Sequence, residues 1–490
     1  MTALLHPISV AATRAAISSS ASGARFLHSF AAPHAPFAAP FAAPMRAPRS
    51  PPPTPGHMQA PPAIALDSAS FAALRARRDA FVDKTDAIAE LLAGDVGMHR
   101  RSRAFFARPR KFGKSLTLDV AATMLAAGEL PTGVMPWPGY KPVDVDAAFG
   151  GLAVHARLLA GDPSLRGLLR RAHFVIKLGL GGATTGAGLR GRLVSKLAGI
   201  AGAAFGDALK KEVLKTAFPD DAISILLHAV PRDVPVALLV DEYDAAIIQD
   251  VVKSRWAAAD DGVEALRSLL VTTKSRVTGA RIERCLVTGV ARFARTSLFS
   301  GANNFADMTD SPLLSRVLGF SEAEIRGTFP AELARLAAGL GVGVDGAVAE
   351  LARWYNGYCY DGATSAFNPY AVLAALEAGA ITECELGAAS GTNWLGLVPG
   401  SVVTGLAEEL LKAGAPAVKM SVDIASIIEA RRVHVVPLLL QTGLLSLVPG
   451  QSDLCRPPNE YARRSLQLMA ATALDAAPAA LAGFAAALRV

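Results

Sequence analysis

The chain has 490 residues, of which 51% are hydrophobic and 19% charged, and this composition excludes intrinsic disorder of the whole chain, because disorder requires low hydrophobicity and high net charge. The formal net charge is +7, but four arginines precede the first acidic residue, Asp67, so the rest of the chain carries only +3 and strong autonomous DNA binding is not expected. No run of eighteen strongly apolar residues occurs, so we expect neither a transmembrane helix nor a membrane partner. The four cysteines lie too far apart in the sequence to indicate a zinc site or a disulfide framework.

Residues 1–65 form a segment rich in alanine, serine and proline, with positive charges only and a repeated phrase, AAPHAPFAAPFAAPMRAP. Such a segment buries too little surface to offset the entropy lost on ordering, so we predict disorder. An acid-free N-terminus that carries arginine and serine is typical of organelle transit peptides. We therefore expect an address for the mitochondrion or the plastid, between which the sequence does not decide. The alternative is a disordered tail without an address, on a protein that stays in the cytoplasm.

Residues 66–310 combine helical patterns with short apolar runs. Apolar residues at helical spacing predict a helix over 68–94. The apolar runs predict four strands, at 104–107, 173–178, 236–240 and 284–290. Because these runs alternate with helical stretches, the pattern predicts an α/β fold with a parallel sheet and crossover helices.

The remainder of the chain is predicted to be mainly helical. Residues 311–400 read as a helical, lid-like domain with turn signals at Asn356-Gly357 and Asn368-Pro369. Residues 401–490 read as an alanine- and leucine-rich C-terminal region that contains a hairpin-like apolar patch at 434–448.

The strongest chemical signal is a glycine-lysine-serine turn between a predicted strand and a predicted helix. Backbone N–H groups at a helix N-terminus bind phosphate, so the turn reads as the second half of a phosphate-binding P-loop. We expect Lys114 to reach the β- and γ-phosphates of ATP and to assist catalysis, and Ser115 to ligate Mg²⁺. Position 108, where the motif has its first glycine, is an arginine, and the alternative reading is an ordinary basic turn. The expected nucleotide-contacting residues are Arg110, Lys111, Phe112, Gly113, Lys114, Ser115 and Leu116.

A second motif follows about 130 residues later, where an apolar run ends in Asp241-Glu242-Tyr243-Asp244. The carboxyl end of a parallel strand faces the ligand, so we expect Asp241 to hold Mg²⁺ and Glu242 to act as general base on the attacking water. Asp244 is expected to lie outside the metal's ligands. The alternative is a strand that simply ends in surface acids.

The next predicted strand contributes Thr288, at the position where a polar residue can sense the γ-phosphate or orient the water. Arg292 and Arg295 follow, and a positioned arginine stabilises transition-state charge in phosphoryl transfer. Either could do so, as could an arginine of a neighbouring subunit. The alternative for both residues is that they are solvent-facing charges on a helix.

The chain resembles the AAA-ATPase-like family over about residues 68–400. The phrases that carry the resemblance, in order, are Asp83-Lys84-Thr85, residues 108–115, Asp241-Glu242-Tyr243-Asp244, Thr288-Gly289-Val290, residues 299–307, Gly319-Phe320-Ser321, Tyr355-Asn356-Gly357-Tyr358 and Asn368-Pro369. The family usually has Arg-Pro-Arg at its phosphate loop, so the resemblance implies that Arg108 is a family trait. It also implies a P-loop ATPase core over residues 66–310.

Many microbial members of that family carry a C-terminal PD-(D/E)xK nuclease-like domain. Such a site needs acids and usually a lysine to hold metal. The last lysine here is Lys419, and about 30 residues follow Asn459. We therefore expect no nuclease domain in this chain.

Together these features predict an ATP-binding protein in which Mg²⁺-dependent hydrolysis switches the helical domain between two arrangements. One alternative is a nucleotide-gated interaction module with negligible turnover, working through a protein partner or as a homo-oligomer. The other is a nucleic-acid-associated factor, which the near-neutral charge after residue 66 supports only weakly.

Overall fold

The structure is a computed structural model that describes residues 63–66, 69–93, 103–169, 171–182, 185–275, 279, 281–292, 304–382, 418–419, 428–429, 432–433 and 435–473. All of them belong to one compact unit, residues 60–490. The predicted transit segment therefore lies outside the described residues, except for 63–65. None of the described helices is both long and apolar enough to span a membrane.

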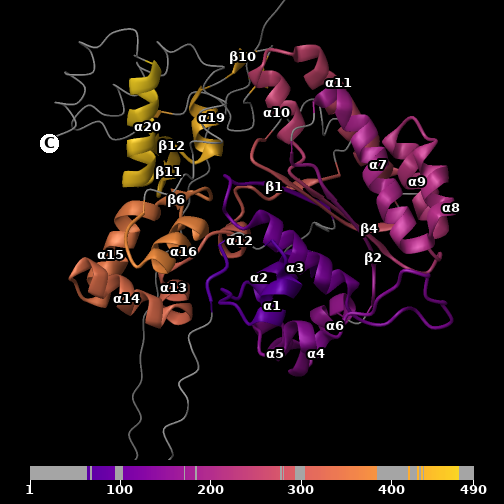
Figure 1. Cartoon of the computed structure of the whole chain (residues 1–490), viewed down its shortest axis with the longest axis horizontal. Coiled ribbons are helices and arrows are strands. Elements are labelled where there is room, and N and C mark those ends of the chain that lie inside the picture. Colours follow the sequence, from indigo (N-terminus) through magenta and orange to yellow (C-terminus); the bar gives the residue numbers. More distant parts are fainter. Residues whose placement is uncertain are drawn as a thin grey trace, which may run out of the picture. The chain divides into compact units, whose positions relative to one another are not determined.

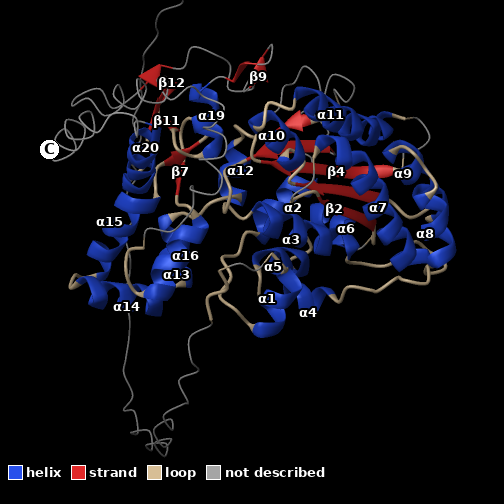
Figure 2. Ribbon diagram, turned by 45° about the horizontal axis from the view of Figure 1, so that its top comes forward, coloured by secondary structure: helices blue, strands red, loops and turns tan. Residues whose placement is uncertain are grey.

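A five-stranded sheet forms the centre of the larger α/β part (Figures 1 and 2). Its strands, in spatial order, are β2 (Phe174–Gly179), β3 (Val236–Asp241), β4 (Ile282–Gly289), β1 (Arg103–Ala107) and β5 (Ala306–Asp307). Every neighbouring pair is parallel, so the predicted parallel sheet is confirmed. All four predicted strands are present within two residues of their expected ends, and the two-residue β5 was not expected.

Helices cover both faces of this sheet, and the buried strand β3 places apolar side chains on each face. Val236, Leu238 and Val240 pack on one face, whereas Ala237 and Leu239 pack on the other. A parallel strand covered on both sides reads as a continuous apolar run, which is why the pattern was visible in the sequence.

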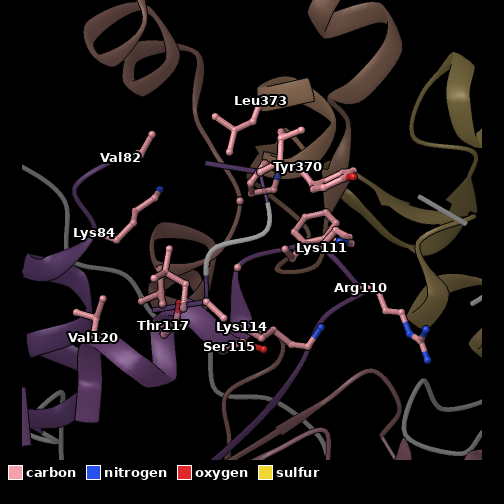
Figure 3. A pocket seen from close by; sticks show the side chains of 18 of the residues that line it. Val82, Lys84, Arg110, Lys111, Lys114, Ser115, Thr117, Val120, Tyr370 and Leu373 are labelled. Carbon is pink, nitrogen blue, oxygen red and sulfur yellow. The ribbon is translucent and has the colours of Figure 1, made fainter. Parts of the chain in front are cut away.

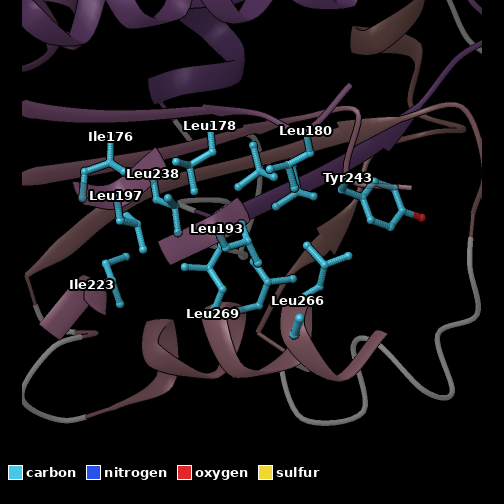
Figure 4. Packing of buried hydrophobic residues seen from close by; sticks show 14 of the residues in the cluster. Ile176, Leu178, Leu180, Leu193, Leu197, Ile223, Leu238, Tyr243, Leu266 and Leu269 are labelled. Carbon is cyan, nitrogen blue, oxygen red and sulfur yellow. The ribbon is translucent and has the colours of Figure 1, made fainter. Parts of the chain in front are cut away.

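The first face is covered by the helices that follow β2 and β3. These are α7 (Gly186–Phe205), α8 (Asp207–Leu214), α9 (Pro219–Ala229), α10 (Ala245–Val252) and α11 (Trp256–Val271), followed by a short 3₁₀ turn, Thr272–Lys274. Figure 4 shows Leu193, Leu266 and Leu269 from α7 and α11 packed against Leu178 and Leu238 of the sheet. Each leucine buried here contributes about 1.5–3 kcal/mol to stability relative to an exposed one.

The second face is covered mainly by helices from the first third of the chain. These are α1 (Phe71–Arg77), α2 (Thr85–Ala93), α3 (Lys114–Ala126), α4 (Val145–Phe149), α5 (Ala153–Leu159), α6 (Pro163–Leu169) and, from later in the chain, α12 (Pro312–Val317). The loop that precedes α3 follows β1, which lies between β4 and β5 in the sheet.

The single helix predicted over 68–94 is wrong, because the structure has two helices, α1 and α2, separated by an irregular segment. Arg78 adopts a left-handed conformation (φ 57°) and its N–H donates to the carbonyl of Arg75, which ends α1. Asp83 then accepts hydrogen bonds from the backbone N–H and the hydroxyl of Thr85, which begins α2. Aspartate favours such local bonds over a helix interior.

The predicted helical region after residue 311 is confirmed where the structure describes it. It contains α13 (Glu322–Thr328), α14 (Pro330–Leu340), α15 (Val344–Tyr355) and α16 (Pro369–Ala378), with a small hairpin of β6 (Tyr358–Cys359) and β7 (Ser365–Ala366). These elements have a core of their own, built around Phe329, Leu336, Leu351 and Phe367. Residues 383–400 of the predicted 311–400 domain lie outside the described residues.

The apolar patch at 434–448 is only partly a hairpin. Its first half is α19 (Val435–Thr442), and the hairpin lies later, between β11 (Ser446–Val448) and β12 (Gln451–Arg456). Periodicity does not separate a continuous apolar run in a buried helix from one in a strand. The other described elements of the C-terminal region are β8 (Val418–Lys419), which pairs with β12, β9 (Ile428–Glu429), β10 (Arg432–Val433) and α20 (Glu460–Ala473).

Candidate functional site

The phosphate-binding turn predicted from the sequence lies between the carboxyl end of β1 and the N-terminus of α3. Gly113 is the residue that precedes the helix, and its φ of +84° is in the left-handed region. A Cβ atom there would meet no atom within 4 Å, so conformation and not space favours glycine at this position. The thirteen-residue helix α3 directs its N–H groups and the positive end of its dipole toward this turn, which favours an anion.

Lys114 folds back onto the loop. Its side chain is buried, and Nζ donates hydrogen bonds to the carbonyl oxygens of Arg108 (2.9 Å) and Pro109 (2.7 Å). Burial lowers the pKa of Lys114 to about 8, and the nearby carboxylate of Asp241 opposes that shift most strongly. A protonated amine held by two neutral carbonyls would gain stronger, charge-assisted bonds from phosphate oxygens.

The turn after β3 places Asp241 and Glu242 differently. Asp241 is buried at the strand end, and within the described part of the chain its Oδ1 has no hydrogen-bond partner. Glu242 is exposed and has a left-handed φ of +52°, which is rare for a residue with a side chain and clusters at functional sites. Its carboxylate lies against Gly181, where a Cβ atom would come within 1.7 Å of Glu242 Oε2.

Tyr243 and Asp244 fasten this turn to the end of β4. The Tyr243 hydroxyl donates to the carbonyl of Ala291 (2.6 Å). Asp244 Oδ2 accepts from the backbone N–H groups of Val290 (2.8 Å) and Ala291 (2.6 Å). Burial raises the pKa of Asp244 to about 6. These bonds hold the ends of two neighbouring strands, and the residues between them, in a fixed relation.

Thr288 lies on β4 opposite Phe106 of β1 and is fully buried. Among the residues that the structure describes, its hydroxyl, like Asp241 Oδ1, has no hydrogen-bond partner. A buried polar atom left unpaired costs about 1–3 kcal/mol, so two of them at adjoining strand ends call for an explanation. Carboxylate and hydroxyl oxygens are the donors that suit Mg²⁺, its bound waters and phosphate groups.

A pocket of about 590 Å³ opens beside the phosphate loop, a size typical of small-molecule sites (Figure 3). Its polar end is lined by Gly113, Lys114, Ser115, Glu242 and Asp244. Asp241 and Thr288 do not themselves line it. Its apolar end is lined by side chains of both the α/β part and the helical region, among them Val82, Ile88, Leu116, Val317, Phe320, Phe329 and Leu373.

Lys84 lines the pocket, and Nζ pairs with the carboxylate of Glu324, at the start of α13, at 2.7 Å. Burial lowers the pKa of Lys84, and the charge of Glu324 opposes that shift. The ion pair joins the segment before α2 to the helical region. Sequence reasoning did not select Lys84 as a site residue, although Asp83-Lys84-Thr85 was among the phrases that carried the resemblance.

All seven residues of the predicted nucleotide-contacting set, 110–116, line this pocket. Arg110 and Lys111 are exposed, and Lys111 Nζ lies 4.2 Å from the centre of the Tyr370 ring. Phe112 is buried, and its ring packs edge-on against Tyr358 and Tyr360. Phe112 thus lines the pocket while its ring packs on the aromatic side chains of a distant segment.

Arg292, a candidate for stabilising transition-state charge, is buried and paired with Asp307 (2.8 Å) and Asp310 (2.9 Å). The backbone N–H of Arg292 also donates to Gln441 (2.6 Å). These partners give it a structural role. Arg295, the other candidate, lies outside the described residues.

Gly181 is a site residue that sequence reasoning missed. It follows β2 in the run Gly179-Leu180-Gly181-Gly182, and a pair of glycines just past a strand end is the signal that could have indicated a close approach. The carbonyl of Gly181 accepts a hydrogen bond from the Arg192 guanidinium, which holds this turn beside Glu242.

Comparison with known proteins agrees with this geometry. A family model described as "Predicted AAA-ATPase" matches residues 66–128 and 202–299, which contain the phosphate loop and the acidic strand end. An uncharacterized protein encoded in the vnfD 5′ region of Azotobacter chroococcum mcd 1 is 30% identical over 308 residues, covering 62% of this chain and 50% of the relative. The chain thus spans about half the length of that relative. No solved structure matches the chain. In these two regions, about a third of the chain, the protein is similar to the family of predicted AAA-ATPases.

Proposed function

We propose that the chain binds ATP with Mg²⁺ at the end of β1 and hydrolyses it, and that turnover rearranges the helical region. The observation that carries the proposal is the juxtaposition of a lysine at a helix N-terminus with two buried, unpartnered oxygens at adjoining strand ends beside a pocket of about 590 Å³. The similarity of two regions of the chain to the model of predicted AAA-ATPases supports ATP as the nucleotide.

The phosphates would lie over the turn before α3. Gly113 would allow close approach of the backbone, and Lys114 would exchange the carbonyls of Arg108 and Pro109 for phosphate oxygens. Ser115 and Asp241 supply the oxygen donors for Mg²⁺, which needs one or two protein ligands because waters and phosphates complete its shell. Mg²⁺ bound there would neutralise charge on the phosphates during transfer.

Glu242 would serve as the general base. Its exposed carboxylate lines the polar end of the pocket, and the turn at φ +52° together with Gly181 defines its position. It would take a proton from water as the water oxygen attacks the γ-phosphorus and the bond to the β,γ-bridging oxygen breaks. Thr288, held rigidly on β4, would orient that water or contact the γ-phosphate.

The base of the nucleotide would occupy the apolar end of the pocket. Leu116 and Val82 line that end from the α/β part, and Phe320 and Leu373 line it from the helical region. A ligand that contacts both parts binds best in one arrangement of them, so its hydrolysis would shift the equilibrium between arrangements. A protein partner or a second copy of the chain would then sense that shift.

Calorimetric titration of the full-length protein with ATP, with and without Mg²⁺, tests the nucleotide site. We expect binding that Mg²⁺ strengthens, that Lys114→Ala abolishes or weakens at least tenfold, and that Ser115→Ala makes less dependent on Mg²⁺. Retention of full, Mg²⁺-dependent affinity by Lys114→Ala would place the nucleotide elsewhere.

A further inference from the structure

Two side chains of the phosphate loop are buried against the β6–β7 hairpin, far along the chain. The guanidinium carbon of Arg108 lies 4.1 Å from the centre of the Tyr360 ring. The ring of Phe112 lies 4.9 Å from that of Tyr358 and 6.2 Å from that of Tyr360, in edge-on contacts. Arg108 also donates to the carbonyl of Thr309 (2.6 Å). The residue that replaces the first glycine of the loop motif is thus an anchor.

The hairpin is held in turn by the C-terminal region, which lies outside the two regions that match the family. The Ser446 hydroxyl accepts from the N–H of Cys359 (2.6 Å) and donates to its carbonyl (3.0 Å). Gly443, at the end of α19, touches the loop directly, because a Cβ atom there would lie 2.9 Å from Pro109. The loop is therefore supported by both the β6–β7 hairpin and the end of α19.

Arg108 also connects this support to Lys114. Its side chain packs on Tyr360, while its carbonyl accepts one of the two hydrogen bonds from Lys114 Nζ. Tyr360 does not line the nucleotide pocket. An effect of Tyr360 on phosphate binding must therefore pass through the loop.

We propose that Tyr360 is a positioning residue for the phosphate loop, and that the β6–β7 hairpin holds the loop, through Arg108, in the conformation that binds nucleotide phosphates. The inference rests on the proposed nucleotide site and deepens it, because it makes phosphate affinity depend on a region that does not touch the ligand. Binding to a loop whose competent conformation is only partly populated weakens in proportion to that population. A desolvated cation–π contact is strong enough for its loss to weaken phosphate binding about tenfold.

The test compares Tyr360→Leu with Tyr360→Phe in the full-length protein. Within the described residues the Tyr360 hydroxyl has no hydrogen-bond partner, so Tyr360→Phe keeps the contact that matters. Trp354→Leu is the matched control, because Trp354 lies under Arg464 (4.5 Å) in the same region and its ring does not meet the loop. Affinities for Mg²⁺–ATP and for adenosine are measured by competition with a fluorescent adenine nucleotide, and hydrogen exchange of the loop is measured without nucleotide.

We expect Tyr360→Leu to weaken Mg²⁺–ATP about tenfold, to leave adenosine within twofold, and to speed exchange over residues 108–114, with Tyr360→Phe and Trp354→Leu near wild type. Equal weakening of ATP and adenosine, or an equal effect of Trp354→Leu, would overturn the inference. If Tyr360→Leu does not fold, Arg108→Lys is tested against the same expectations. If the wild-type protein binds neither Mg²⁺–ATP nor adenosine, the proposed function is refuted. If the wild type binds Mg²⁺–ATP and Tyr360→Leu binds it equally well, only the positioning role is refuted.

Discussion

A single methyl group at position 181 is the sharpest probe of the candidate site. In Gly181→Ala the new Cβ atom would lie 1.7 Å from Oε2 and 2.8 Å from Cδ of Glu242, which is too close for atoms that are not bonded to each other. The φ of Gly181 is outside the left-handed region, so alanine is compatible with the backbone. The Glu242 carboxylate, at the end of a flexible and exposed side chain, must therefore move.

The two consequences of that movement differ in size. Moving an exposed side chain costs little folding free energy, so the melting temperature should stay within a few degrees of wild type. A displaced general base loses its contribution to the rate, which is typically ~10²–10⁴-fold. We expect kcat for ATP hydrolysis to fall by about that factor while ATP affinity changes less than threefold, because Lys114 and the loop are untouched.

Gly179→Ala is the matched control, since a Cβ atom there would meet nothing within 4 Å and the residue also ends β2. Steady-state phosphate release and ATP titration of both variants, beside Glu242→Gln, make the comparison. Turnover by Gly181→Ala at the wild-type rate would refute the reasoning that Glu242 acts from this position. A defect in Gly179→Ala as large as that in Gly181→Ala would refute it as well.

Three further predictions address the charges of the site and the N-terminal segment. Burial lowers the pKa of Lys114 to about 8, and it is the protonated amine that binds phosphate, so ATP affinity should fall as pH rises through about 8. Lys114→Arg should remove that pH dependence in ATP titrations from pH 6.5 to 9.5. A pH-independent wild type would contradict this. Arg292→Ala should lower the free energy of unfolding, measured by chemical denaturation, by roughly 2–3 kcal/mol. This is less than the loss of a fully buried ion pair would cost, because Asp310 is half exposed. The folded variant should keep the wild-type rate of ATP hydrolysis, and a selective loss of that rate would restore Arg292 as a charge-stabilising residue. Residues 1–65 fused to a fluorescent protein should direct it to mitochondria or plastids, and a diffuse cytoplasmic signal would favour the tail without an address.

The parts of the fold that could be predicted are those whose burial leaves a local pattern. Strands such as β3 are continuous apolar runs because helices cover both faces, and the turn before α3 carries its own signature in Gly113, Lys114 and Ser115. The break between α1 and α2 was missed because it depends on one left-handed residue, Arg78, for which arginine is no signal.

The unpredicted parts of the site depend on contacts between residues far apart in the sequence. Phe112 reads as part of a nucleotide-binding loop, yet its ring is buried against Tyr358 and Tyr360, about 250 residues later. Gly181 belongs to the site only because the turn after β2 meets the turn after β3. Local propensity carries no record of such pairings, since a parallel sheet assembles its edge from distant segments.

Release of phosphate from Mg²⁺–ATP by the full-length protein, measured beside Lys114→Ala and Glu242→Gln, tests the phosphate loop and the general base in one experiment. We expect turnover by wild type, loss of both binding and turnover in Lys114→Ala, and loss of turnover with retained binding in Glu242→Gln. Binding of ATP without turnover by wild type would contradict the role of Glu242 as general base and identify a nucleotide-gated module. Unchanged turnover in Lys114→Ala would contradict the site itself.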